Sequence, residues 1–226
     1  MEAEPTTRVA RVREAIAAAC ARCGREPTAV TLVGVSKMQP PAVVQPVIEA
    51  GVTILGESRV QEATDKLPHL TGVTELHLVG RLQRNKVKPA VALFDVIQSV
   101  DRIALAEAVQ AAARAAGKVQ RVFLQVNIGR EAQKGGVAPE ALPALATAVA
   151  AMANLRLEGL MAVPPFDPEP EAARPYFRAL VRLAASLRTG GGPLFALSMG
   201  MSNDFEVAIE EGATHVRVGT ALFGER

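Results

Sequence analysis

Eight short apolar runs, separated by Ala- and Leu-rich stretches with helical spacing, constrain the fold of this chain more than any other feature. Strands that alternate with helices pair in parallel through crossover connections, and eight such units most naturally close into a barrel. We therefore predict an α/β fold of the (β/α)8 TIM-barrel type. The predicted strands are residues 29–36, 52–55, 75–79, 95–100, 119–128, 155–163, 193–199 and 214–218.

The rest of the chain is consistent with a single domain, residues 1–226. An extra helix is predicted over residues 6–23, before the first strand. With 226 residues and 49% apolar content, the chain can bury one substantial core. The competing architecture, an open doubly wound sheet, would place a glycine-rich turn after the first strand, but that turn reads SKMQPP. The glycine motifs of dinucleotide-binding and P-loop proteins are not present in the sequence.

Composition and charge exclude several classes of partner. Charged residues make up 21% of the chain, the net charge is +2 and the arginines are scattered, so we expect no nucleic acid and no membrane surface as a partner. No apolar run has the length of a membrane span, and the charged N-terminus does not resemble an export signal, so we expect a cytoplasmic protein. A monomer is expected. Cys20 and Cys23 form a C-x-x-C without a second ligand pair, and we assign them no redox or metal role.

Polar residues stand where the predicted strands end. In barrels of this type the chemistry gathers at the carboxyl ends of the strands, so a polar rim above an apolar barrel indicates a ligand site. Along the chain, the polar positions at these ends include Ser36, Lys37, Glu57, Ser58, Arg59, His77, Arg81, Ser99, Asp101, Asn127, Ser198 and Arg217.

Lys37 follows the first apolar run, so its stem begins among apolar neighbours. Poor hydration lowers the pKa of a lysine and makes the neutral amine available to attack a carbonyl and form a Schiff base. A lysine whose stem lies along the strand end while its ammonium stays in water is the simpler explanation of this residue taken alone. The features of the neighbouring loops distinguish a Schiff-base lysine from a lysine whose ammonium only reaches the solvent.

The loops after the seventh and eighth strands have the features of a phosphate site. The segment LSMGMSND supplies Gly200, the Ser202 hydroxyl and free backbone N–H groups at a helix start, although Ser202 or Asn203 could equally be a helix cap. The eighth strand leads into RVGTALFG, where Gly219 permits a close approach and Thr220 offers a second hydroxyl. Phosphate sites in barrels are often built from these two loops, so we predict one here.

Arg217 lies between two valines of the eighth strand, so its guanidinium must meet an anion, a polar acceptor or water. An internal ion pair, for instance with Glu57, is the alternative. The eighth strand of a closed barrel lies beside the first, which places Arg217 near Lys37. A Schiff-base lysine, a partner for an aromatic ring and a phosphate cup together describe a site for pyridoxal phosphate.

At this point the sequence resembles the pyridoxal phosphate homeostasis proteins, and the matching segments cover the chain nearly from end to end. The last and longest of them is also the most specific. The segments are GVSKMQP at 34–40, GESRVQEATDK at 56–66, LHLVGRLQRNK at 76–86, VNIGREAQKGG at 126–136, GLMAVPP at 159–165, and LSMGMSNDFEVAIEEGATHVRVGTALFG at 197–224.

The resemblance implies a barrel like the N-terminal domain of alanine racemase, with pyridoxal 5'-phosphate held as a Schiff base on Lys37. It further implies phosphate contacts from Ser202, Gly219 and Thr220, and a contact from Arg217 to the pyridine nitrogen. The other predicted cofactor-binding residues are Met199, Gly200, His77 and Ser58. Two positions depart from the expected pattern, since Ser58 replaces an Asn and Leu76 replaces a Trp. A contact from Ser58 is therefore in doubt, and we expect a more open pocket wall at Leu76.

Three functions fit a Schiff-base lysine. They are a homeostasis protein that holds the cofactor without turnover, an amino-acid racemase that uses the same cofactor, and an aldolase in which Lys37 meets a phosphorylated sugar directly. Racemisation needs an acid or base on each face of the cofactor. The lone tyrosine, Tyr176, lies in a predicted helix, and His77 is better explained as a packed side chain. His69 and His215 have weaker claims.

Arg217 favours the first of these functions. A guanidinium does not give up its proton at ordinary pH, so it would leave a facing pyridine nitrogen unprotonated and weaken the ring as an electron sink. We therefore predict a non-catalytic carrier of pyridoxal phosphate. Apo-enzymes that use this cofactor are the candidate recipients, although the sequence names none of them.

Overall fold

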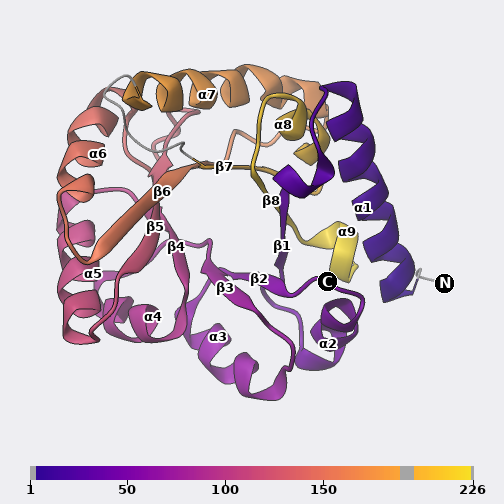
Figure 1. The fold of residues 1–226 in the computed structure, drawn as a ribbon, viewed down its shortest axis with the longest axis horizontal. Coiled ribbons are helices and arrows are strands. Elements are labelled where there is room, and N and C mark those ends of the chain that lie inside the picture. The colour runs from indigo at the N-terminus through magenta and orange to yellow at the C-terminus, as the bar shows by residue number, and fades with distance from the viewer. Residues whose placement is uncertain (1–3, 189–195, 225–226) are drawn as a thin grey trace.

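The computed structural model describes residues 4–188 and 196–224. Within them, eight parallel strands form a closed barrel in sequence order, with β8 paired to β1 (Figure 1). This confirms the predicted fold. The strands are β1 (Thr31–Val35), β2 (Ile54–Glu57), β3 (Glu75–Leu78), β4 (Val96–Val100), β5 (Gln120–Val126), β6 (Leu155–Ala162), β7 (Ala196–Met201) and β8 (His215–Val218). The seventh was predicted to begin at residue 193, and residues 193–195 lie outside the described residues.

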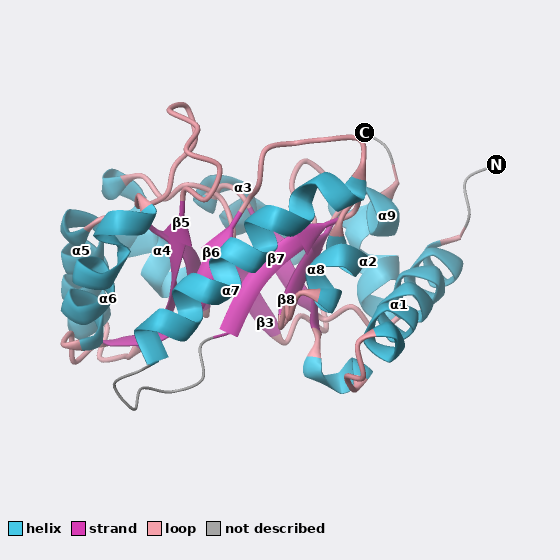
Figure 2. Ribbon diagram, turned by 90° about the horizontal axis from the view of Figure 1, so that it is seen from above, coloured by secondary structure: helices cyan, strands magenta, loops and turns pink. Residues whose placement is uncertain are grey.

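Helices surround the barrel and cover its outer face (Figures 1 and 2). The helix expected over residues 6–23 is confirmed as α1. The helices are α1 (Pro5–Arg22), α2 (Pro41–Glu49), α3 (Val60–Lys66), α4 (Val87–Leu93), α5 (Ile103–Ala115), α6 (Leu142–Ala150), α7 (Arg174–Arg188), α8 (Phe205–Glu210) and α9 (Thr220–Phe223). None of the helices in the described ranges is both long and apolar enough to cross a membrane.

Helix α1 closes the ring by lying against the last two helices, α8 and α9. Val9, Val12 and Ile16 form its buried stripe. The Arg22 guanidinium pairs with the carboxylates of Glu206 and Glu210 on α8, at 2.8 and 2.6 Å. The start of the chain is thereby attached to the segments that follow β7 and β8.

The two faces of the strands carry different kinds of side chain. Successive side chains of a strand point to opposite sides, so the outward residues meet the helices and the inward residues fill the barrel. The layer between strands and helices is aliphatic, and Val216 and Val218 of β8 belong to it. The barrel interior holds a small apolar cluster, made by Val96, Phe123 and Met161, together with a chain of polar residues. This interior leads to the carboxyl ends of the strands.

Candidate functional site

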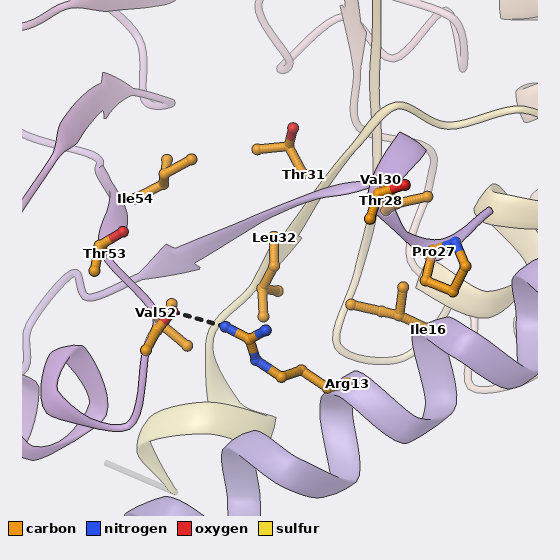
Figure 3. A pocket seen from close by; sticks show the side chains of 11 residues that line it. Arg13, Ile16, Pro27, Thr28, Val30, Thr31, Leu32, Val52, Thr53 and Ile54 are labelled. Carbon is orange, nitrogen blue, oxygen red and sulfur yellow. Dashed lines mark hydrogen bonds between the residues drawn. The ribbon is translucent and has the colours of Figure 1, made fainter.

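The two ends of the barrel differ in what they offer a ligand. A pocket of about 350 Å³ opens at the amino ends of β1 and β2, beside α1 (Figure 3). Arg13 in this pocket donates to the Gly51 carbonyl over 2.7 Å, so the backbone already binds this side chain. Lys37 lies at the opposite end, directly after β1. Because barrels of this type carry their sites at the carboxyl ends of the strands, we take that end as the candidate site.

Lys37 occupies the turn that follows β1 and is half-buried. The next residue, Met38, is 65% exposed and has a φ of 61°, in the left-handed region that residues with a Cβ avoid. The loop after β8 packs against the same strand end, since a Cβ added to Gly219 would lie 3.3 Å from the Val35 carbonyl oxygen. The structure therefore brings Gly219 to the end of the strand that carries Lys37.

Ser202 joins the loops that follow β7 and β8. Its Oγ accepts hydrogen bonds from the backbone N–H groups of Gly219 at 3.1 Å and of Ala221 at 3.5 Å. The hydroxyl of Ser202 keeps its own proton to donate. Thr220, the first residue of α9, is exposed beside this contact. The Ser202 hydroxyl thus meets the amides at the start of α9, with Thr220 between them in the chain, and a phosphate at this place stays a prediction.

Neither Ser202 nor Asn203 caps the following helix, which was the alternative role of this segment. Asp204 stands at the N-cap position of α8 without a side-chain bond to the helix amides, and its carboxylate accepts the N–H of Met201 at 2.6 Å. Asn203 instead donates to the Asp167 carbonyl at 3.0 Å. Gly200 is needed at the end of β7, because its φ is 90° and a Cβ there would lie 2.6 Å from the Ala208 Cβ.

Arg217 points into the barrel and is only 4% exposed. It donates from Nη1 to Ser198 Oγ at 2.6 Å and from Nη2 to the Ala162 carbonyl at 2.9 Å. Burial, opposed by the nearby Asp204, lowers the pKa of Arg217 to about 10, so the side chain stays a cation at neutral pH. The ion pair with Glu57 considered from the sequence is wrong, because Glu57 lies on the outer side of β2 and pairs with Lys66 at 2.7 Å.

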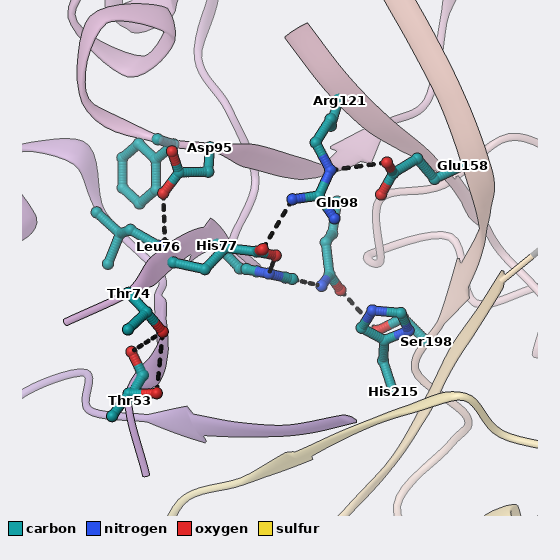
Figure 4. A network of polar contacts seen from close by, with 12 residues as sticks. Thr53, Thr74, Leu76, His77, Asp95, Gln98, Arg121, Glu158, Ser198 and His215 are labelled. Carbon is teal, nitrogen blue, oxygen red and sulfur yellow. Dashed lines mark hydrogen bonds and ion pairs between the residues drawn. The ribbon is translucent and has the colours of Figure 1, made fainter. Parts of the chain in front are cut away.

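A polar chain continues from Arg217 through the barrel, and its lower half is seen in Figure 4. Ser198 Oγ donates to Gln98 Oε1 at 2.6 Å, and the Gln98 amide donates to Nδ1 of His77 at 2.6 Å. His77 therefore carries its proton on Nε2, which contacts the Glu75 carboxylate. Hydrogen bonds from His77 and from Arg121 lower the pKa of Glu75 to about 2, although burial opposes them. Every donor along this chain points from the cation towards the anion.

Several residues predicted to bind the cofactor lie away from the Lys37 turn. His77 is fully buried and both ring nitrogens have protein partners, as in the packed alternative. Met199 is fully buried in the outer aliphatic layer, so its side chain points away from the interior. Ser58 is half-buried after β2, and its backbone lies against Gly80. The open wall expected at Leu76 is wrong, because this side chain is 3% exposed and belongs to the same outer layer.

Comparison with known proteins supplies the family. The family model described as the alanine racemase N-terminal domain matches residues 9–226. A pyridoxal phosphate homeostasis protein of Aquifex aeolicus is 47% identical, with 97% of each chain covered. Another, from Pseudomonas aeruginosa, is 45% identical over 96% of this chain and 92% of its own. The chain belongs to the pyridoxal phosphate homeostasis proteins.

A solved structure of this family has the same fold. PipY of Synechococcus elongatus, in a structure with pyridoxal phosphate bound, superposes with a TM-score of 0.80 and 37% identity, over 92% of this chain and all of PipY.

In this pyridoxal phosphate homeostasis protein, a group of charged residues contacts the backbone on both sides of Lys37, and this group was not predicted from the sequence. Lys66, Glu57 and Glu62 form a largely buried ionic group next to the turn. From the sequence, Glu57 was considered only as a polar strand end and as a partner of Arg217, and Lys66 and Glu62 received no role. The available signal was local, since Glu62 and Lys66 are four residues apart on one helix face and follow a strand that ends in Glu57. Their link to Ser36, far away in the chain, is visible only in the fold.

Proposed function

We propose that this protein binds pyridoxal 5'-phosphate through a Schiff base on Lys37 and serves the homeostasis of that cofactor without efficient catalysis. The single observation that carries the proposal is the contact of the two loops with each other and with the end of β1. Ser202 holds the Gly219 amide, and Gly219 lies against the Val35 carbonyl, two residues before Lys37. These contacts support a site in which the hydroxyls and amides of the loops lie at the end of the strand that leads to Lys37.

The residues present fit the cofactor. Ser202, Thr220 and the Gly219 backbone, next to the tight turn at Gly200, would hold its phosphate. Arg217 would face the ring nitrogen, because two of its five N–H groups are engaged by Ser198 and Ala162 and the others remain for a ligand. When bound, pyridoxal phosphate supplies an aldehyde that condenses with an amine and a ring that takes up electrons. The weaker contacts proposed are the Met199 backbone and Ser58, with His77 acting through Gln98 and Ser198.

Two features favour a carrier over a racemase-like enzyme. The cationic Arg217 would keep a facing ring nitrogen unprotonated, so the ring would withdraw electrons weakly. The residues considered as a second acid or base are also badly placed. Tyr176 lies in α7, which covers the outside of β6 and β7 (Figure 2). His215 faces the barrel interior, where burial lowers its pKa to about 4.

Apo-enzymes that use pyridoxal phosphate are the recipients we propose. A groove of about 840 Å³ runs over the carboxyl ends of β2, β3 and β4, beside the candidate site. Five of its lining residues are cations, namely Arg59, Arg81, Arg84, Lys86 and Arg102, and none of the lining residues is acidic. Such a groove suits the acidic surface of a recipient. Direct transfer should slow as salt is raised, while release into a cofactor trap should change little.

A cytoplasmic location and a monomeric state belong to the same proposal. Cys20 and Cys23 are free thiols, which suits a reducing compartment. Light scattering of the loaded protein tests the monomer, and a mass of twice the chain would contradict it.

The test of the proposed function is the absorbance of the purified protein. After incubation with pyridoxal phosphate and removal of excess, wild type should be yellow, and borohydride should abolish the colour and fix the cofactor to Lys37. Lys37→Ala should stay colourless because it lacks the amine. Lys88→Ala, at an exposed lysine of α4, is the matched control and should behave like wild type. A wild-type protein that remains colourless would refute the proposal.

A further inference from the structure

Lys66, the last residue of α3, carries a buried ammonium behind the Lys37 turn. Its side chain is 6% exposed, and its Nζ donates to the Glu57 carboxylate at 2.7 Å, the Ser36 carbonyl at 2.7 Å and the Glu62 carboxylate at 2.9 Å. An ammonium has three protons to donate, so these three contacts use all of them. The position of Lys66 is therefore fixed by its own helix, through Glu62, and by two other segments of the chain, through Glu57 and Ser36.

The same group of residues holds both neighbours of Lys37. On one side, the Ser36 carbonyl accepts from Lys66, and the Ser36 hydroxyl donates to the Glu57 carboxylate at 2.7 Å. On the other side, the backbone N–H of Met38 donates to the Glu62 carboxylate. Because Met38 is in the left-handed region, with a φ of 61°, the contact with Glu62 helps to keep the turn in a conformation that it would otherwise leave.

Added stability is a poor explanation of this cluster. Removing ions from water offsets much of their attraction, so buried ion pairs contribute little net stability. One oxygen of the Glu57 carboxylate, Oε2, is buried and has no hydrogen-bond partner in the described part of the chain. Burial accordingly raises the pKa of Glu57. A cluster with this penalty is better explained by the geometry that it imposes on its neighbours.

We propose that Lys66, acting with Glu57 and Glu62, is a positioning residue that orients Lys37 for covalent attachment of pyridoxal phosphate. This inference rests on the proposed function, since it concerns the same lysine and the same ligand. Lys66 does not touch the ligand in this arrangement. It holds the backbone on both sides of Lys37, so the ε-amine starts from a fixed point next to the loops of Ser202 and Gly219.

The experiment measures the covalent attachment of pyridoxal phosphate to Lys37 separately from the non-covalent binding of a related ligand. Lys66→Met keeps the aliphatic stem and removes the ammonium. The rate at which the visible band appears on mixing with pyridoxal phosphate should fall about ten- to a hundredfold, the usual effect of a small misplacement of a reacting group. Affinity for pyridoxamine 5'-phosphate, which has no aldehyde and binds only non-covalently, should stay within about twofold, since its phosphate and ring contacts are made elsewhere.

A second pair of variants keeps the test independent of how well Lys66→Met folds. Glu62 is partly exposed, with 22% of its side chain accessible, and tolerates replacement better. Glu62→Ala removes the acceptor of the Met38 amide, whereas Glu62→Gln retains an oxygen there. Glu62→Ala should load slowly and should exchange the Met38 amide hydrogen faster in the unloaded protein. Glu62→Gln should restore most of both properties.

The matched control is Lys118→Met. The ammonium of Lys118 also binds backbone carbonyls, those of Val91 and Phe94 at 2.9 and 3.2 Å, but at the amino end of the barrel. Loading at the wild-type rate is expected for this variant. If wild type itself fails to load, the proposed function fails. If wild type loads and the Lys66 and Glu62→Ala variants load equally fast, or if Lys118→Met slows loading as much as Lys66→Met does, the positioning role is overturned.

Discussion

Arg217 illustrates how single residues set the chemistry of this barrel. Its charge is enclosed by protein, yet its hydrogen-bond acceptors are a hydroxyl and a carbonyl, and not a carboxylate. Because Arg217 forms no ion pair within the described residues, its charge would attract an anionic or electron-rich ligand. The anion at the far end of the polar chain, Glu75, is reached only through Ser198, Gln98 and His77.

The proposed phosphate contacts give the first residue-scale prediction. Ser202→Ala combined with Thr220→Ala should weaken retention of pyridoxal phosphate at least about tenfold, because two hydrogen bonds to a charged acceptor are lost while the backbone amides remain. Affinity for pyridoxal, which has no phosphate, should not change. Equilibrium dialysis with both ligands measures the effect. Thr147→Ala, at an exposed hydroxyl bonded within α6, is the control. Unchanged retention of pyridoxal phosphate in the double variant would assign these loops another role.

Acid should weaken the fold through His215. Burial, reinforced by the nearby His77, lowers the pKa of His215 from 6.5 to about 4. Between these values the unfolded chain binds a proton that the folded chain does not, so stability is lost as the pH falls from about 6.5 towards 4. Urea unfolding should show a loss of about 2 kcal/mol in this window for wild type that is absent in His215→Gln. Equal pH profiles for the two proteins would disprove the assignment.

At the scale of elements, the strands could be predicted from the sequence. Which side chains point into the barrel and which point out of it could be predicted only in part. Eight apolar runs bounded by turns predict eight strands, and alternation predicts that Arg217 points away from Val216 and Val218. The orientation of Met199 and Leu76 was not predicted, because a shift of one residue in a strand reverses its faces and both strands are buried on both sides.

Contacts between distant elements were the other part that could not be predicted. The hydrogen bonds from Lys66 to the Ser36 carbonyl and from Arg217 to the Ala162 carbonyl depend on which elements the barrel brings together. No local sequence pattern shows which distant elements become neighbours. The positions proposed for a phosphate could be named from the sequence because their glycines and hydroxyls lie close together in it, and their role stays a prediction. The barrel architecture then adds the rule that these loops face the first strand.

Gly200 gives a prediction for the end of β7. Gly200→Ala should lower the free energy of unfolding more than Gly117→Ala, although both glycines have a positive φ, of 90° and 65°. The backbone strain alone should cost about 1 to 2 kcal/mol at either site. At Gly200 the new Cβ would also meet Ala208 at 2.6 Å, whereas at Gly117 nothing lies within 4 Å, so Gly200→Ala should lose at least about 1 kcal/mol more. Similar losses of unfolding free energy for the two variants, in thermal or urea unfolding, would show that the end of β7 shifts to make room for the new Cβ.

At the scale of the whole molecule, the described residues form one closed barrel with the candidate site at the carboxyl ends of its strands. The elements that could carry a second acid or base, such as α7 with Tyr176, lie outside the strands. An accessible face would suit the proposed carrier, because its ligand would have to leave for another protein.

We expect the loaded protein to racemise or decarboxylate common amino acids no faster than free pyridoxal phosphate does. The reason is that Tyr176 and His215 are badly placed as a second proton donor and that the proposed contact with the Arg217 cation would weaken the electron demand of the ring. Chiral chromatography of the products over many equivalents of substrate is the measurement. Sustained turnover in wild type that disappears in Lys37→Ala would restore the enzyme interpretation.

The closure of β8 onto β1 also has a consequence for the life of the chain before it is complete. During synthesis Lys37 emerges long before Ser202, which follows β7, and before Gly219 and Thr220, which follow β8. A nascent chain would therefore display the lysine before the proposed phosphate loops exist. Because pairing of β8 with β1 brings the two together, we expect loading to require a barrel that has closed correctly. A translation product stopped before β8 should retain the lysine and fail to retain pyridoxal phosphate.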